Sequence, residues 1–178
     1  GVDRWYTECA CTPGARWKKP FFTAMHEISS WVDSVYERHA SELVSDPWEL
    51  RNQIVQMKHG QKKMNEVCGE LGAPDLGENE LKKLETLISA QYECVRMFTS
   101  CGWFFDEFHR IEPQNNIAYA AKAIWLTQQA TGEQIDPKII EDMSHVRSEK
   151  TGLRADTILS QTFIRAENEQ NGLSQQLN

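Results

Sequence analysis

Reactive side chains are concentrated in residues 99–108, where Cys101, Trp103, Asp106 and Glu107 stand beside further aromatic rings. A carboxylate next to aromatic rings can have its pKa raised by desolvation, and it can then act as a general acid. However, one segment supplies both acids, and the sequence indicates no second group that would converge on them. We therefore expect Asp106 or Glu107 to cap or solvate the start of a short helix, and we assign no catalytic residue.

Three aromatic residues follow Gly102 directly. Trp103, Phe104 and Phe105 cannot place all three rings on one face of a helix. Gly102 allows a sharp backbone change or the close approach of another chain segment. At least one ring is therefore expected to point away from the local core, toward another domain, a ligand or solvent. For Trp103, an exposed contact role and a core role both remain open.

The sequence contains six tryptophans, which is more than a small helical domain requires. Flat indole rings often line carbohydrate clefts, because they stack on the apolar faces of sugars. Trp31, Trp48 and Trp125 lie on or beside regular apolar stripes. We therefore expect these three rings in the core.

Thiolate metal binding or redox chemistry is the second chemistry to consider. Cys9 and Cys11, together with Cys101 or a histidine, would supply ligands, but structural zinc sites usually need four ligands with paired Cys-x-x-Cys spacing. That spacing is absent, and the five histidines lie one per segment. The odd count of five cysteines favours free thiols. We expect no metal site and no cofactor. A redox or metal module is kept as an alternative function, after the two functions given at the end of this section.

The apolar side chains recur at steps of three and four residues over most of the chain, which is the period of an α-helix. Asp46-Pro47 and Asp136-Pro137 are typical helix starts, with an aspartate N-cap before a first-turn proline. The alternation typical of strands is absent. These patterns predict an all-α fold, a single bundle of five to six antiparallel helices. The helices are expected at about 20–44, 46–71, 79–98, 113–130, 137–146 and 154–167, with Gly60 as a weak point in the second.

The pattern divides the chain into three parts. Residues 1–19 have no clear period and contain a Pro13-Gly14 turn signal, so we expect an irregular, aromatic arm packed against an apolar surface. Residues 20–167 form the helical bundle. Residues 168–178 are rich in glutamine and asparagine, and we expect a frayed or disordered tail.

Composition excludes some classes of function. The formal charge is −7, with 40% apolar and 25% charged residues, which is typical of a soluble globular domain and argues against nucleic-acid binding. The sequence has neither an apolar run of membrane-spanning length nor a charged-then-apolar leader. We expect a cytoplasmic location, with no membrane partner. Because the chain begins at Gly1 without a methionine, we expect it to be a fragment of a longer protein.

Several motifs resemble the helical C-terminal region of proteins related to glycoside hydrolase family 57. The resemblance covers about residues 1–130, and its most specific part is the Thr-Ser-Cys-Gly-Trp-Phe-Phe motif at 99–105. The matching segments are Gly1-Val2-x-Arg4-Trp5, Cys9-x-Cys11, Trp17-Lys18-Lys19-Pro20, Asp46-Pro47-Trp48-Glu49-Leu50-Arg51, residues 97–107, Ile111-Glu112 and residues 119–124.

The resemblance implies two domains with different roles in one enzyme. In that family a distorted β/α barrel carries a glutamate nucleophile and an aspartate acid/base for retaining hydrolysis or transfer at α-glucosidic bonds. A helical domain follows the barrel, and a tryptophan-bearing loop of that domain reaches the cleft. The barrel and both catalytic carboxylates are absent from this chain. The chain would therefore shape a glucan site without cleaving anything itself.

The family likeness also implies particular residues and partners. The implied partners are an N-terminal β/α-barrel catalytic domain of the same polypeptide and an α-glucan or oligosaccharide. The implied substrate-binding residues are Trp103, Phe104, Asp106 and Glu107, and the implied domain-junction residues are Trp5, Cys9, Cys11, Trp17 and Cys101.

Accessory-domain function predicts an exposed apolar patch around Trp5 and Trp103, where the missing domain would pack. The alternative is a stand-alone helical protein-interaction module, in which the aromatic segment is a binding hot spot.

Overall fold

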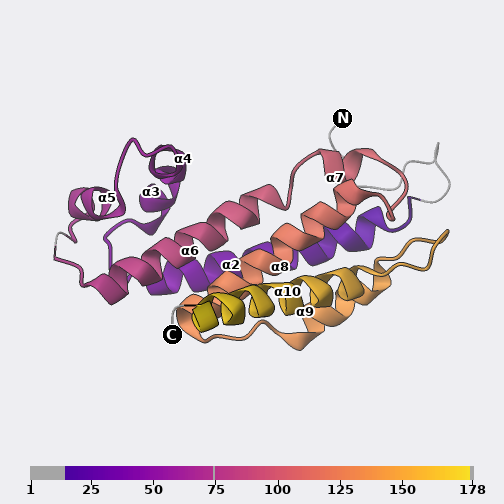
Figure 1. Cartoon of the computed structure of the whole chain (residues 1–178). Coiled ribbons are helices and arrows are strands. Elements are labelled where there is room, and N and C mark those ends of the chain that lie inside the picture. Colours follow the sequence, from indigo (N-terminus) through magenta and orange to yellow (C-terminus); the bar gives the residue numbers. More distant parts are fainter. Residues whose placement is uncertain (1–14, 74, 177–178) are drawn as a thin grey trace.

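A computed structural model describes residues 15–73 and 75–176, and these residues form helices joined by turns, with one isolated β-bridge between Arg147 and Arg154. The predicted all-α bundle is confirmed. The four longest helices lie side by side, with shorter helices at both ends of the bundle, and the short helix at 137–142 packs along the helix at 18–40 (Figure 1). The elements are α2 (Lys18–Ala40), α3 (Pro47–Asn52), α4 (Ile54–Lys58), α5 (Met64–Glu70), α6 (Glu78–Arg96), α7 (Cys101–Phe104), α8 (Ile111–Thr131), α9 (Pro137–Asp142), the 3-10 turn η1 (Met143–His145) and α10 (Ala155–Gln176).

Both predicted aspartate-proline helix starts are confirmed. The Oδ1 of Asp46 accepts a hydrogen bond from the Glu49 backbone N–H at 2.9 Å at the start of α3. Asp136 does the same for the Lys138 N–H at 2.9 Å at the start of α9. Each cap satisfies one of the backbone donors that a helix N-terminus leaves without an intrahelical partner.

Several predicted boundaries differ from the structure. The segment 46–71 is divided into α3, α4 and α5, with Gly60 at φ +68° in the second break. Helix α2 begins at Lys18 because Pro20 fits into a first helical turn, where its missing N–H has no intrahelical partner to lose. Helix α10 continues to Gln176, through residues 168–176, where we expected a frayed tail; no proline interrupts this segment.

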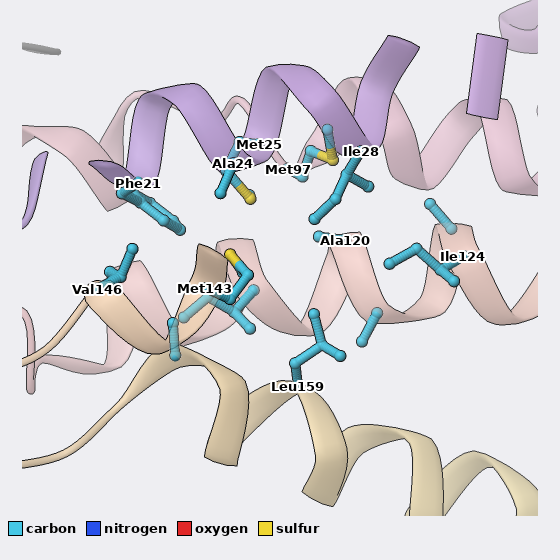
Figure 2. Packing of buried hydrophobic residues seen from close by; sticks show 14 of the residues in the cluster. Phe21, Ala24, Met25, Ile28, Met97, Ala120, Ile124, Met143, Val146 and Leu159 are labelled. Atoms are coloured by element: carbon cyan, nitrogen blue, oxygen red, sulfur yellow. The ribbon is translucent and has the colours of Figure 1, made fainter. Parts of the chain in front are cut away.

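The main core lies between α2, α8, α10 and the C-terminal end of α6. Phe21, Met25 and Ile28 of α2 face α8, and Leu159 approaches α8 from α10 (Figure 2). Helix α8 contributes small side chains to this contact; they are Ala120, Ala121 and Ala123, all buried. Small residues allow the backbones of neighbouring helices to approach closely.

A second core cluster lies at the other end of α2 and α6, under the short helices α3 to α5. It includes Tyr36, Leu50, Val67, Leu84 and Leu87, all buried. The Tyr36 hydroxyl donates a hydrogen bond to the backbone carbonyl of Pro47, which ties α2 to the start of α3. Among the described residues, no helix is long and apolar enough to cross a membrane.

Candidate functional site

Residues 99–108 form a compact corner between α6 and α8, with the single turn α7 at its centre (Figure 1). The Trp103 side chain is fully buried in this corner. Its ring lies 4.5 Å from the Phe21 ring and 6.1 Å from the Phe22 ring, measured between centroids. The predicted exposed patch around Trp103 is therefore wrong, because α7 turns the ring inward onto α2. The other half of that prediction, Trp5, lies outside the described residues.

Gly102 explains why the corner is so tight. A Cβ atom at this position would lie 2.2 Å from Nδ2 of Asn116, far inside van der Waals contact. Asn116 is buried on α8. Its Oδ1 accepts a hydrogen bond from the Thr99 hydroxyl at 2.8 Å, and its Nδ2 donates to the Thr99 carbonyl at 3.1 Å. The glycine therefore admits an amide that connects the end of α6 to α8.

Trp17, which we expected at a domain junction, also belongs to the core. The residue is 3% exposed, and its ring packs on Phe21 and Phe108. Its indole N–H donates to the Asp106 carbonyl at 2.7 Å. The ring is therefore covered by the bundle itself, because it anchors the start of α2 to the α7 corner. Cys101 is exposed, so its role at a junction stays a prediction; Cys9 and Cys11 lie outside the described residues.

The two acids of the corner hold separate ion pairs. Asp106 Oδ1 accepts from the Lys18 ammonium at 3.2 Å, and the Lys18 side chain is only 5% exposed. Glu107 is exposed, and its carboxylate lies 3.4 Å from the Lys150 ammonium and 3.3 Å from Nε2 of His109. Asp106 therefore has a structural partner, whereas Glu107 remains accessible from solvent.

Glu107, His109 and Ser148 lie in a row that resembles an acid, imidazole and hydroxyl array. The Ser148 Oγ is 3.4 Å from Nδ1 of His109. However, Ser148 is buried, and its Oγ accepts the Thr151 backbone N–H at 3.2 Å within the turn before α10. A nucleophile must reach its substrate, so we assign this serine to the turn and not to catalysis.

The outward-facing ring of the corner is Phe104, which is 61% exposed. The neighbouring Phe105 ring meets it edge to face at 5.2 Å, and the Arg110 guanidinium lies 3.8 Å from the Phe105 ring. The prediction that at least one of the three rings points away from the core is therefore confirmed. Of the four predicted substrate-binding residues, Phe104 and Glu107 are exposed, Asp106 is partly exposed and Trp103 is buried.

A groove of about 720 Å³ lies between α2 and α9, next to the corner. Phe22, His26 and Trp31 of α2 line it, and Ile139 lines it from α9. Phe22 packs edge-on against the buried Trp103 and lies 4.2 Å from the His26 ring. Trp103 therefore supports an aromatic wall of the groove without being exposed in it.

The polar lining of this groove consists of hydroxyls and carboxylates; it comprises Thr23, Ser30, Ser34, Glu27, Asp136 and Asp142, with Lys138 as a cation. One oxygen of Glu27, Oε2, is buried and has no hydrogen-bond partner among the described residues. A second hollow of about 370 Å³ shares Thr23 and Asp142 with the groove. It extends the lining along α2 toward Lys19 and His145.

This groove was not predicted from the sequence, because Trp31 was expected in the core. The structure places Trp31 partly exposed in the groove lining. A signal was present: Thr23, Glu27, Ser30 and Ser34 recur at helical steps beside Trp31, which marks one face of α2 as polar and aromatic. The α9 half carries no comparable signal.

Among the described residues, no group of three or more histidine, cysteine or acidic side chains is placed to hold a metal ion. The Cys9-x-Cys11 pair is outside these residues, so the expected absence of a metal stays a prediction. Cys68 and Cys94 are buried free thiols, and a buried thiol packs as a small apolar side chain.

Comparison with known families gives one match. The family model for a domain of unknown function, DUF3536, matches residues 14–170. The chain therefore belongs to this family, and the match extends over the whole helical bundle as far as the middle of α10. No curated protein and no solved structure matched the chain.

Proposed function

We propose that this domain is the accessory helical domain of a glycoside hydrolase family 57-like enzyme that acts on α-glucans. In this proposal the α2–α9 groove binds the glucan, and the outer edge of the α7 corner packs against the β/α-barrel that supplies the catalytic carboxylates. The observation that carries it is the lining of the groove, which combines aromatic rings, hydroxyls and carboxylates.

This lining suits a sugar chain better than other ligands. Sugar rings have apolar faces that stack on indole and phenyl rings, such as those of Trp31 and Phe22. Their hydroxyls donate to carboxylates and exchange hydrogen bonds with serine and threonine. Oε2 of Glu27, one of the lining residues, has no hydrogen-bond partner among the described residues. Three carboxylates against one lysine disfavour an anionic ligand.

The groove and its smaller extension favour an elongated ligand. They share Thr23 and Asp142, so their linings are continuous along α2. An oligosaccharide bound there would follow the helix axis and contact aromatic rings at successive turns.

The motif that resembles the family 57 helical region has a supporting role in this proposal. Gly102 allows the corner to pack tightly, and the Trp103 ring packs on α2. There it contacts Phe22, which lines the groove. The exposed Phe104 edge is then available for the partner domain. The same exposed edge favours the alternative function, a stand-alone protein-interaction module in which Phe104 is a hot spot.

Isothermal titration calorimetry of the 178-residue chain with maltoheptaose tests the proposal. We expect saturable binding that Trp31→Ala weakens by about tenfold or more, because it removes a stacking ring, and that Trp31→Phe partly retains. Trp48→Ala is the matched control, since this partly exposed tryptophan lies on α3 outside the groove lining. Absence of saturable binding, or equal losses in the Trp31→Ala and Trp48→Ala variants, would contradict glucan binding by the groove.

A further inference from the structure

Another, smaller pocket of about 290 Å³ involves α6, α8 and α10. Helix α8 packs against both α6 and α10, and all three helices contribute lining residues. The residues that line it are Glu93, Arg96, Ala118, Tyr119, Lys122, Trp125, Thr162, Arg165 and Ala166. None of them lines the α2–α9 groove or belongs to the α7 corner.

Hydrogen-bond donors dominate this pocket. Arg96, Lys122 and Arg165 are cations, and Tyr119 adds a hydroxyl, whereas the Thr162 hydroxyl already donates to the Ile158 carbonyl at 2.9 Å. In addition, Nε1 of Trp125 is buried and has no hydrogen-bond partner among the described residues. A buried indole N–H normally has an acceptor, whereas the described residues offer none to this one.

Glu93, the one carboxylate among the described lining residues, already has partners. Glu93 has a side chain only 6% exposed, and its two oxygens lie 3.2 and 2.9 Å from Nη1 of Arg96. The Lys122 ammonium lies 3.4 Å from the same carboxylate. Two cations therefore surround Glu93, and Arg165 adds a third positive charge to the lining. In a chain with a formal charge of −7, this local excess of cations attracts anions.

The Arg96 side chain has a fixed orientation that suits an anionic ligand. Its guanidinium lies 3.9 Å from the Tyr119 ring and 5.5 Å from the Tyr92 ring, so stacking fixes its plane. Only Nη1 is used in the bonds to Glu93; Nε and Nη2 make no hydrogen bond within the described part of the chain. An arginine with a fixed plane and spare donors is well suited to a phosphate group.

We propose that this pocket binds a small organic phosphate. The phosphate would accept hydrogen bonds from Arg96, Lys122 and Arg165, and the ring or chain that carries it would pack on Tyr119 and Trp125. The volume is at the lower end for small-molecule sites, which fits a ligand the size of a phosphorylated monosaccharide. The small side chains of Ala118 and Ala166 leave room for it.

NMR of the 178-residue chain tests this site through the Trp125 indole N–H, whose resonance is assigned by its loss in Trp125→Phe. The probes are glucose 6-phosphate, inorganic phosphate and uncharged glucose. We expect a saturable shift of this resonance with glucose 6-phosphate, a weaker one with inorganic phosphate and none with glucose.

Charge-removing variants then test the donors. Lys122→Gln and Arg165→Gln alter exposed side chains, so the fold is retained, which circular dichroism checks. Each should weaken glucose 6-phosphate binding by about tenfold, the effect of losing one charged hydrogen bond. Lys138→Gln, an exposed lysine at the α2–α9 groove, should leave the affinity unchanged.

Absence of a saturable shift at millimolar glucose 6-phosphate would overturn the proposal, as would an equal loss in Lys138→Gln, which would indicate nonspecific charge attraction. A shift with glucose of the same size would also overturn it. Maltoheptaose binding depends on Trp31 and not on Lys122 or Arg165, so failure here is distinguishable from failure of the proposed function.

Discussion

At the scale of single residues, Asn116 occupies the space that a side chain at Gly102 would need. The closest Asn116 atoms would lie 2.2, 2.4 and 2.8 Å from a Cβ. Because Asn116 is buried and bonded to both the hydroxyl and the carbonyl of Thr99, it cannot move without losing those bonds.

Gly102→Ala should therefore destabilise the fold by about 2–4 kcal/mol, from overpacking and two weakened buried hydrogen bonds. Urea denaturation followed by circular dichroism measures the change. Gly77→Ala is the control, because a Cβ there meets only Glu80 Oε2 at 3.5 Å, an ordinary contact. In an Asn116→Ala background, Gly102→Ala should cost much less; an equal cost in both backgrounds would show that Asn116 is not the obstacle.

Replacing one or the other partner of the Lys18–Asp106 ion pair should cost unequal amounts of stability. Asp106→Asn leaves the buried Lys18 ammonium without its carboxylate, whereas Lys18→Met removes the charge and keeps an apolar stem. We expect Asp106→Asn to cost about 1–2 kcal/mol, reduced because the Asp106 side chain is 43% exposed, and Lys18→Met to cost less. Urea titrations of both variants measure the difference. A larger loss for Lys18→Met would mean that the ion pair itself stabilises the corner.

Thiol reactivity should separate Cys101 from Cys94. Burial raises the pKa of the Cys94 thiol to about 11, against an ordinary value of 9.0, although the Ser29 hydroxyl partly offsets this. Cys101 is exposed. Iodoacetamide at pH 8, followed by peptide mass spectrometry, should therefore label Cys101 quickly and Cys94 only on unfolding. Equal labelling rates in the folded protein would contradict the described burial.

The raised pKa of Cys94 makes the free energy of unfolding depend on pH. A raised pKa means that the folded state holds the Cys94 proton more tightly than the unfolded state does. The stabilisation is complete below pH 9 and is lost as the pH rises through 11. A Cys94→Ala variant should lack this part of the alkaline loss of stability.

At the scale of elements, local chemistry made the helix starts predictable. Asp46 and Asp136 act within three residues of themselves, so the sequence alone identifies them. The breaks within 46–71 were not predictable in full, because Gly60 marked one of them whereas nothing marked the α3–α4 break at Gln53. There the packing of short helices over the second core cluster decides the boundary.

Asp46→Ala should destabilise the protein by about 1 kcal/mol, because the Glu49 N–H loses its acceptor at the start of α3. Asp46→Asn should cost much less, since asparagine retains a capping oxygen. Thermal unfolding of the two variants measures the difference. Equal losses would assign the effect to the charge of Asp46 and not to the cap.

At the scale of the whole molecule, the two core clusters could be predicted only as helical stripes. Their members lie at the periodic apolar positions, as Phe21, Met25 and Ile28 illustrate. The groove could not be predicted, because its halves at residues 22–34 and 136–142 meet only after α2 and α9 pack together. The burial of Trp103 was not predictable for the same reason, because it depends on how α2 packs against the α7 corner.

In the proposed function, α-glucan binds in the α2–α9 groove and not on the α7 corner. Chemical-shift mapping of the ¹⁵N-labelled chain with maltoheptaose separates these two locations. We expect saturable shifts at the Trp31 indole, at Ser30 and Ser34 and at the start of α9, with little change at Phe104 and Glu107. Shifts confined to Phe104–Glu107, or no saturable shift at millimolar sugar, would contradict it.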